Sequence, residues 1–250
     1  MLLRDAKPDM EVFMVVRHHE IDFATGALVF PGGSVDPDDG VVAGEPQRFV
    51  SIAAVDPDAM AIRVGGIRET FEECGVLLAR PRGERALVSA ERVGDIEAKH
   101  RARLHAGETK FSAVLAAEDL VAATDLLVPF AHWITPPHMP KRFDTHFFLA
   151  VAPPDQLAAH DGHESVDSVW ISPAAALAGA DSGRYTIIFP TRLNVEKLGR
   201  SKTTADAVAG ARAGTIVTVM PSHTRVAGGV IMHIPAEAGY GGADFHVRRP

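Results

Sequence analysis

The sequence predicts an α+β fold in which helices cover both faces of a mixed β-sheet. Two observations support this prediction. Short runs rich in β-branched and aromatic residues alternate irregularly with longer segments of helical pattern, and no repeat of fixed period or clear linker interrupts them. The chain has 250 residues, 46% of them hydrophobic and 23% charged, an ordinary composition for a globular protein with a sizeable core. We therefore expect a single domain over residues 1–250.

The expected strands are runs in which β-branched and aromatic residues predominate. They cover residues 11–17, 27–30, 127–134, 143–151, 166–171, 215–219 and 229–234. The second run is followed by Pro31-Gly32-Gly33, and this sequence predicts a tight turn that ends the strand.

The most strongly signalled helix begins at Pro57. Asp56 is a suitable N-cap, Pro57 is suited to the first helical position, and the helix is expected to run to about Val76. Further helices are expected at 89–105, from Pro173 for a short alanine-rich stretch, and at 192–212. Residues 34–56 contain several Asp, Gly and Pro and are expected to form a loop.

Composition argues against several functional classes. No run of about 18 apolar residues exists, so we expect no membrane-spanning segment. The first residues have no apolar stretch typical of a signal peptide, and the single cysteine, Cys74, agrees with a reducing compartment, so we expect a cytoplasmic protein. The net charge of −7 disfavours nucleic acid as a partner, which would need clustered Lys and Arg. A small anionic nucleotide remains compatible, because a bound metal ion can neutralise its phosphates.

Three carboxylates stand within one turn of the expected helix. Glu69, Glu72 and Glu73 occupy positions i, i+3 and i+4, so they share a face and repel one another. A hard dication with oxygen ligands, Mg²⁺ or Mn²⁺, would relieve this repulsion. Arg68 stands four residues before Glu72 and can pair with it. The alternative for such a pattern alone is a solvated acidic helix face.

The residues around the carboxylates favour the metal site. The run Arg68-Glu69-Thr70-Phe71-Glu72-Glu73-Cys74-Gly75-Val76 matches the second half of the Nudix box, G-x5-E-x7-R-E-U-x-E-E-x-G-U. Upstream, Phe30-Pro31-Gly32-Gly33 resembles the strand and turn that begin this box. By this resemblance the chain is identified as a member of the Nudix hydrolase superfamily, and the resemblance implies the Nudix α/β/α sandwich with a mixed sheet.

The spacing of the box departs from the family pattern. Gly33 and Arg68 are 35 positions apart, whereas the standard pattern separates them by 14, so about 21 residues are inserted. We place the insertion at about 34–56. The separate upstream glutamate of the box then has no certain counterpart, and the candidates are Asp38, Asp39, Glu45 and Asp58.

The interrupted box is similar to that of a Nudix branch that includes peroxisomal coenzyme A diphosphatases. The same branch carries two further motifs, which stand here as Trp133-Ile134-Thr135-Pro136 and Arg142-Phe143-Asp144-Thr145-His146-Phe147-Phe148. The resemblance covers roughly residues 11–200, and residues 200–250 are expected to be a C-terminal extension.

The resemblance also implies roles for particular residues. Glu69 and Glu73 would be the principal ligands of Mg²⁺ or Mn²⁺, with Glu72 and the Gly33 carbonyl as additional ligands, and Arg68 would orient the box. The general base would be a box glutamate or Glu164. Lys141, Arg142 and Arg63 are candidates to bind a substrate phosphate. The alternative for Arg142 is a structural pair with Asp144. Twelve histidines show no zinc-binding spacing, although His160 and His163 flank Glu164 and are candidates for phosphate contact.

The preferred function is metal-dependent hydrolysis of a diphosphate bond in coenzyme A or acyl-coenzyme A, giving 3′,5′-ADP and 4′-phosphopantetheine. The upstream signature that accompanies coenzyme A specificity in one Nudix group is absent before Phe30. ADP-ribose or a nucleotide sugar is therefore the alternative substrate, and a non-catalytic nucleotide sensor is a third hypothesis. The expected partner is a small-molecule nucleotide, and relatives imply a possible homodimer.

Overall fold

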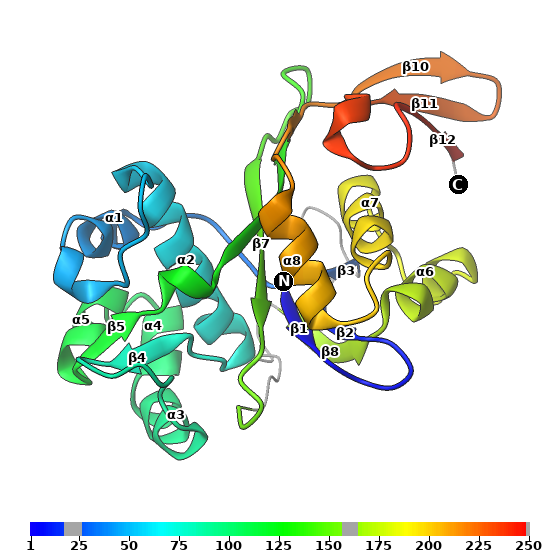
Figure 1. Cartoon of the computed structure of the whole chain (residues 1–250). Coiled ribbons are helices and arrows are strands. Elements are labelled where there is room, and N and C mark those ends of the chain that lie inside the picture. Colours follow the sequence, from blue (N-terminus) through cyan, green and yellow to red (C-terminus); the bar gives the residue numbers. More distant parts are fainter. Residues whose placement is uncertain (18–26, 157–164, 249–250) are drawn as a thin grey trace.

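A seven-stranded mixed sheet runs through the centre of the molecule in the computed structural model, which describes residues 1–17, 27–156 and 165–248 (Figure 1). Its strands are β1 (Leu2–Arg4), β2 (Glu11–Arg17), β3 (Leu28–Val29), β6 (Val128–Ile134), β7 (Asp144–Val151), β8 (Ser165–Ile171) and β9 (Thr218–Val219). Their order is β3-β2-β1-β7-β6-β9, and β8 pairs with β2. The β1–β7 and β6–β9 pairs are parallel and the other pairs are antiparallel, so the predicted mixed sheet is confirmed.

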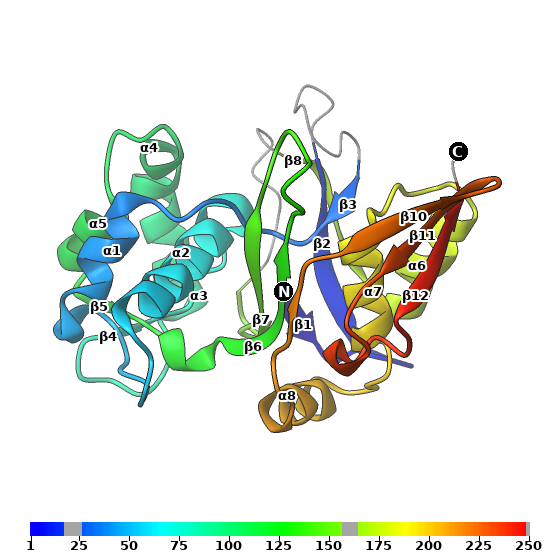
Figure 2. The ribbon, with the colours of Figure 1, turned by 90° about the horizontal axis from the view of Figure 1, so that it is seen from above.

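Helices lie on both sides of this sheet (Figures 1 and 2). One side carries α1 (Pro37–Ala43), α2 (Pro57–Cys74), α3 (Ala90–Ile96), α4 (Ala102–His105) and α5 (Phe111–Ala117), together with a two-stranded sheet of β4 (Ala79–Pro81) and β5 (Leu120–Ala122). The other side carries α6 (Pro173–Asp181), α7 (Phe189–Leu198), α8 (Thr204–Ala213) and a three-stranded sheet of β10 (Ser222–Val226), β11 (Gly229–His233) and β12 (Asp244–Arg248). The predicted α+β class, with helices on both faces, is therefore confirmed.

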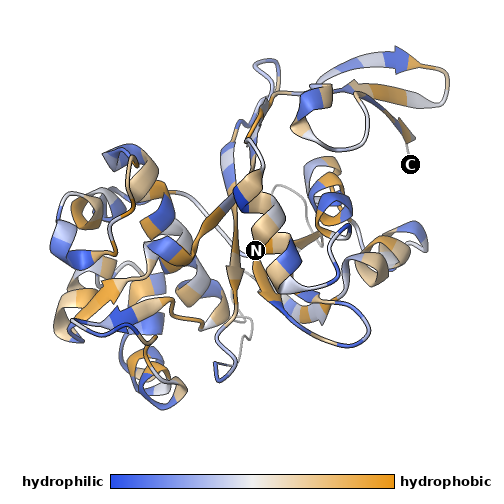
Figure 3. Ribbon diagram, in the orientation of Figure 1, coloured by the Kyte–Doolittle hydropathy of each residue, from blue (hydrophilic) through white to orange (hydrophobic). Residues whose placement is uncertain are grey.

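Two hydrophobic cores follow from this layering, one on each face of the sheet. Successive side chains of a strand point to opposite faces. Along β2, Phe13 and Val15 enter the core beneath α2, whereas Val12 and Met14 enter the core beneath α7 and α8. Hydrophobic and hydrophilic bands alternate along the helices in Figure 3, as expected of helices that bury one face. Within the described residues, no helix combines the length and the hydropathy needed to cross a bilayer.

Helix α2 forms where the sequence predicted it. The Asp56 side chain accepts a hydrogen bond from Ala59 N, and Pro57 occupies the first turn, where its missing N–H costs nothing. The helix ends at Gly75, whose φ of 70° lies in the left-handed region and whose N–H donates to the Phe71 carbonyl. The caps at Asp56 and Gly75 therefore set the limits of the helix that carries Glu69, Glu72 and Glu73.

Two local expectations were wrong. Residues 34–56 are not simply a loop, because they contain α1 and a short 3-10 helix at Pro46–Arg48. The N-cap of α1 is Asp36, and the Asp36 N–H donates in return to the carboxylate of Asp39, which completes a capping box. The expected helix at 192–212 is two helices, α7 and α8, and α8 has a new N-cap at Thr203.

Candidate active site

The Arg68 side chain joins the helix of the box to the segment before it. Its Nε donates to Asp39 Oδ1 and its Nη2 to Asp39 Oδ2, both at 3.0 Å, so the guanidinium and the carboxylate form a two-point pair. Asp39 lies on α1 and is fully buried. A buried carboxylate needs such a partner, because an unpaired buried charge is strongly destabilising. The pair therefore holds α1 against α2.

The rest of the same guanidinium organises two of the glutamates. Arg68 Nη1 donates to Glu69 Oε1 at 2.9 Å and to Glu72 Oε1 at 3.0 Å, and Nη2 also donates to the Ser34 carbonyl at 2.7 Å. Burial alone would lower the pKa of Arg68, but the hydrogen bonds to Asp39 and the charges of Glu69 and Asp39 raise it above its usual value. Arg68 is thus a permanent cation that fixes the orientation of both glutamates.

The turn after β3 approaches the other side of this cluster. Gly32 N donates to Glu73 Oε2 at 2.9 Å. A Cβ atom at Gly33 would lie 2.5 Å from Glu69 Oε1, a distance that only glycine avoids without moving the carboxylate. The structure therefore brings Gly33, Glu69 and Glu73 together, although the turn and the helix are far apart in sequence.

This donor set fits a hard dication. Asp39, Glu69 and Glu72 share the Arg68 guanidinium, and Glu73 accepts from Gly32 N beside them, so four carboxyl groups accompany one arginine. Carboxylate and carbonyl oxygens are the ligands that Mg²⁺ and Mn²⁺ prefer. Glu69 and Glu73 both lie close to the backbone of Gly32 and Gly33, where the sequence predicts that a carbonyl completes the ligand set. The individual ligand roles of these residues remain predictions.

Arg63, predicted to bind substrate phosphate, lies in a different setting. Its side chain is buried, with 7% of the residue exposed. One of its Nη atoms donates to the carbonyls of Leu127 and Thr124, and its guanidinium lies 5.0 Å from the centre of the Phe148 ring. These contacts support the packing of α2 on the sheet, and the phosphate role of Arg63 remains a prediction.

Lys141 and Arg142 lie in the exposed connection between β6 and β7. Arg142 Nε donates to the Thr135 carbonyl at 3.2 Å. Among the described residues, the ion pairs of Asp144 are with His132 and His146, so the alternative of an Arg142–Asp144 pair is not what the structure shows. Glu164, His160 and His163 lie outside the described residues.

One hollow of about 420 Å³ lies beside the same connection, where it meets the C-terminal sheet. Its lining consists of Pro136, Pro137, His138, Met220, Pro221, Ser222 and His223. Because none of the glutamates contributes to it, the candidate active site is defined by its charged groups and not by this hollow.

Asp39 was only one of four candidates in the sequence, and the structure distinguishes it from the others. It is the residue that pairs with Arg68, and it lies six positions after Gly33, the spacing that the box gives to its separate acid. Asp38 instead accepts from Ser112, and Asp56 rather than Asp58 caps α2. The six-residue spacing was the signal that could have identified Asp39.

An arginine-ordered group of helical glutamates, set against a glycine turn at the end of a strand in an α/β/α sandwich, is the arrangement of a Nudix hydrolase. The comparison with protein families agrees, because the family model described as the NUDT19 Nudix domain matches residues 44–198. This match spans more than half of the chain. The chain therefore belongs to the NUDT19 Nudix domain family.

The similarity to two individual relatives is lower than 25% in sequence identity. The chain is 24% identical over 196 residues to "Putative nudix hydrolase 7" of Caenorhabditis elegans, and 23% identical over 227 residues to "Acyl-coenzyme A diphosphatase NUDT19" of Xenopus laevis. These matches cover 78% and 76% of this chain but only 58% and 60% of the two relatives, so the chain spans about three fifths of their length. A crystal structure of a Nudix hydrolase from Alicyclobacillus acidocaldarius is similar with a TM-score of 0.65 and 29% identity, covering 83% of this chain and 92% of that one.

Proposed function

We propose that the protein is a divalent-metal-dependent diphosphatase, which hydrolyses the phosphoanhydride bond of a nucleoside-diphosphate-linked substrate. One observation carries this proposal. A single buried guanidinium, that of Arg68, orients Glu69 and Glu72, while the turn after β3 holds Glu69 and Glu73 from the other side. Carboxylates held this close repel one another. A bound dication would relieve this repulsion, and the same ion would neutralise the phosphates of a substrate.

Each residue of the cluster has a distinct part in this proposal. Glu69 and Glu73, with Glu72 and the Gly33 carbonyl, would hold Mg²⁺ or Mn²⁺. The bound metal would polarise the diphosphate and lower the pKa of the attacking water. Arg68 positions Glu69 and Glu72, and the Gly32 N–H positions Glu73. A box glutamate would accept the proton of the attacking water, with Glu164 as the alternative base.

We also propose that Asp39 replaces the separate glutamate of the box. Its two-point contact with Arg68 and its six-residue distance from Gly33 support this assignment. The additional residues would then lie between Asp39 and Arg68, in the stretch that includes the end of α1 and the beginning of α2, and would not begin at residue 34. On this view the insertion lengthens the connection between two parts of the site while leaving their contact intact.

Coenzyme A or an acyl ester is the substrate that we favour. The Xenopus relative is named an acyl-coenzyme A diphosphatase, and the family model bears the same NUDT19 name. Coenzyme A differs from ADP-ribose and from nucleotide sugars by its ribose 3′-phosphate, which requires cationic donors. Arg142 and Lys141 are exposed cations near the start of β7 and would supply them.

A substrate panel tests these proposals. Purified protein is incubated with Mg²⁺ or Mn²⁺ and coenzyme A, acyl-coenzyme A, 3′-dephospho-coenzyme A, ADP-ribose, NADH or a nucleotide sugar, and products are separated chromatographically. We expect 3′,5′-ADP as a product from coenzyme A. We also expect a lower kcat/KM for the 3′-dephospho form, by a factor that corresponds to roughly 1.5–3 kcal/mol of transition-state stabilisation, the value of one charge-assisted contact. Equal rates on the two forms would instead favour ADP-ribose or a nucleotide sugar. Saturable binding without turnover of any compound would favour the sensor.

Arg142→Ala identifies the cation that makes the contact. If Arg142 binds the 3′-phosphate, the variant loses most of the preference for coenzyme A over its 3′-dephospho form while retaining its rate on the latter. Lys141→Ala is the matched control from the adjacent position. If the preference for coenzyme A over its 3′-dephospho form persists in both variants, the connection between β6 and β7 does not bind the 3′-phosphate.

A further inference from the structure

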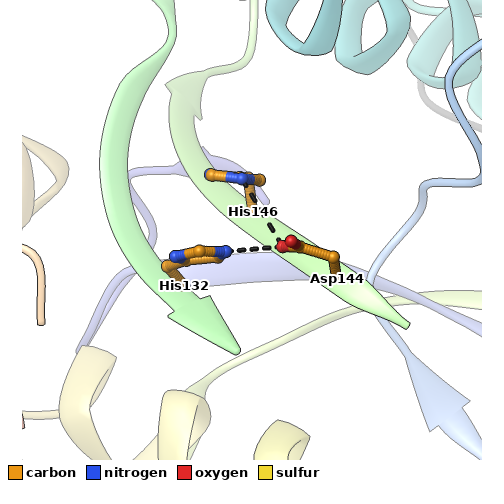
Figure 4. Close-up of side chains that lie close together, drawn as sticks. All are labelled: His132, Asp144 and His146. Carbon is orange, nitrogen blue, oxygen red and sulfur yellow. Dashed lines mark hydrogen bonds and ion pairs between the residues drawn. The ribbon is translucent and has the colours of Figure 1, made fainter. Parts of the chain in front are cut away.

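A second group of potential metal ligands, which includes none of the glutamates of α2, lies on β6 and β7 (Figure 4). In the antiparallel register of these strands, His132 is opposite His146 and Ile134 is opposite Asp144. His146 and Asp144 are two residues apart on β7, so both side chains project from the same face of the sheet as His132. Three donor side chains from two strands therefore converge.

The face is the one that α2 covers. Phe148 follows His146 by two residues and lies beneath the guanidinium of Arg63 on α2. Trp133, the neighbour of His132, points the other way and donates to Tyr240 Oη at 2.8 Å. The cluster is accessible, because the side chains of His132, His146 and Asp144 are 16%, 35% and 62% exposed.

The distances between the donor atoms are short. His132 Nε2 lies 2.5 Å from Asp144 Oδ1, and His146 Nε2 lies 3.7 Å from the same oxygen. The two imidazole rings are stacked, with centroids 4.0 Å apart and an interplanar angle of 15°. One ligand atom from each residue lies within 4.8 Å of the others. The cluster is compact enough for a single ion.

We propose that His132, Asp144 and His146 form a metal site for a divalent transition ion of the Zn²⁺ class. Two imidazole nitrogens and one carboxylate oxygen suit Zn²⁺, Co²⁺ or Mn²⁺ and leave room for water or an anionic group as a further ligand. Mg²⁺ is a poor match, because it prefers oxygen ligands. The site is thus chemically distinct from the glutamate cluster.

The hydrogen bond of His132 to β9 supports this assignment. His132 Nδ1 lies 2.8 Å from Thr218 Oγ1, and metal-binding histidines are usually oriented by such a bond from their second nitrogen. When Nδ1–H donates to Thr218, Nε2 presents a lone pair to the carboxylate of Asp144. In this tautomer a cation is needed between the two acceptors, whereas in the other tautomer Nε2–H donates to Asp144 and the Thr218 hydroxyl donates to Nδ1. A proton can bridge one pair of atoms, whereas a metal ion serves all three side chains.

Binding requires only a small rearrangement. Ligand atoms about 2.1 Å from a tetrahedral ion lie roughly 3 Å or more apart, so His132 and Asp144 must separate slightly and His146 must approach. Asp144 is largely exposed and can rotate without disturbing a core. The framework of β6, β7 and β9 already fixes the positions of the three backbones.

Metal titration in the presence of excess Mg²⁺ tests the proposal directly. Mg²⁺ occupies oxygen sites, so Co²⁺ added afterwards reports on the nitrogen-containing site. We expect one equivalent of Co²⁺ to produce the intense visible absorption of a four-coordinate ion, and Zn²⁺ to displace it. His146→Ala and Asp144→Asn should each weaken binding by on the order of 10²-fold, and Thr218→Val by roughly 10-fold, because it removes only the orienting bond.

The chain provides a matched control in its C-terminal sheet. His233 Nδ1 lies 2.7 Å from Asp244 Oδ1 and its Nε2 lies 2.8 Å from Thr224 Oγ1, which repeats the threonine–histidine–aspartate chain, but among the described residues no third histidine, cysteine or carboxylate ligand atom lies within 4.8 Å of both. His233→Ala should leave Co²⁺ binding unchanged. Absence of a saturable absorption band, or a band that persists in both His146→Ala and Asp144→Asn, would overturn the proposal and leave a proton-bridged pair. Circular dichroism of each variant checks that the fold is retained.

Discussion

The glutamate cluster of α2 and the histidine–aspartate cluster of β6 and β7 belong to the same side of the sheet, but they balance charge in opposite ways. The first gathers three carboxyl groups around one buried guanidinium, with that of Glu73 beside them, so acidic groups outnumber the basic one. The second places one exposed carboxyl group beside two imidazoles and contains no arginine or lysine. The comparison teaches that the acidic cluster depends on an internal cation for its stability, whereas the imidazole cluster can exist with or without an added ion.

Removing the internal cation should have the largest effect. Arg68→Met leaves the fully buried Asp39 without its partner, and we expect a loss of about 3–5 kcal/mol in the free energy of unfolding. Urea denaturation measures this loss. The double variant Asp39→Asn/Arg68→Met should recover part of it, because position 39 then carries no unpaired buried charge. A double variant no more stable than Arg68→Met would show that the pair does not support α1 in this way.

Substitution of a single glutamate should affect activity more than stability. Glu73→Gln removes the charge of one proposed metal ligand from a cluster of like charges, so we expect kcat to fall by on the order of 10²-fold or more with the fold intact. Turnover at saturating Mg²⁺ and urea denaturation give the two readouts. Glu91→Gln, on an exposed turn of α3, is the control and should match the parent. Near-normal turnover of Glu73→Gln would contradict the proposed site.

A smaller effect is expected from crowding the glycine turn. Gly33→Ala introduces a Cβ atom 2.5 Å from Glu69 Oε1, and the flexible carboxylate can retreat from it. We expect kcat to fall by roughly 10-fold, because the ligand is displaced, with little change in stability. Gly40→Ala is a suitable control, since a Cβ atom there meets no neighbour within 4 Å. Equal activity of the two variants would show that the position of Glu69 is not critical.

The smallest effect should come from the exposed cluster in the absence of metal. Asp144→Asn weakens the contacts with His132 and His146, but exposed ion pairs contribute less than about 1 kcal/mol. Urea denaturation with a chelator present measures this value, and the control is the same experiment on Arg68→Met. A loss as large as that of Arg68→Met would mean that the two clusters do not differ as described.

The elements of the box could be predicted because their signals are local. The N-cap Asp56, the helical spacing of Glu69, Glu72 and Glu73, and the terminal Gly75 all lie in one continuous stretch, and the structure places α2 accordingly. Strands β2, β3, β6, β7 and β8 were also predicted within one or two residues, since their runs of β-branched and aromatic residues are largely buried, whereas the short β1 between β2 and β7 was not predicted. In both cases the determining interactions are between near neighbours in the chain.

Interactions between distant segments were harder to foresee. The contact of Asp39 with Arg68 depends on the docking of α1, whose own signal, the Asp36–Asp39 capping box, is short and lies among Asp, Gly and Pro. The convergence of His132 and His146 depends on the register of β6 against β7, which shifts between Pro129 and Ala131. A shift of one residue reverses the face to which a side chain points, and sequence alternation alone does not reveal it.

The hydrogen bond from Gly32 to Glu73 makes the integrity of the proposed active site observable by hydrogen–deuterium exchange. This amide is protected by a side chain 41 residues further along the chain and not by a neighbouring strand. It therefore exchanges whenever the turn separates from α2, even while the amides of the central strands remain protected. Slow exchange at Gly32 would report an assembled site, and selectively fast exchange would reveal molecules that have lost the site while keeping the fold.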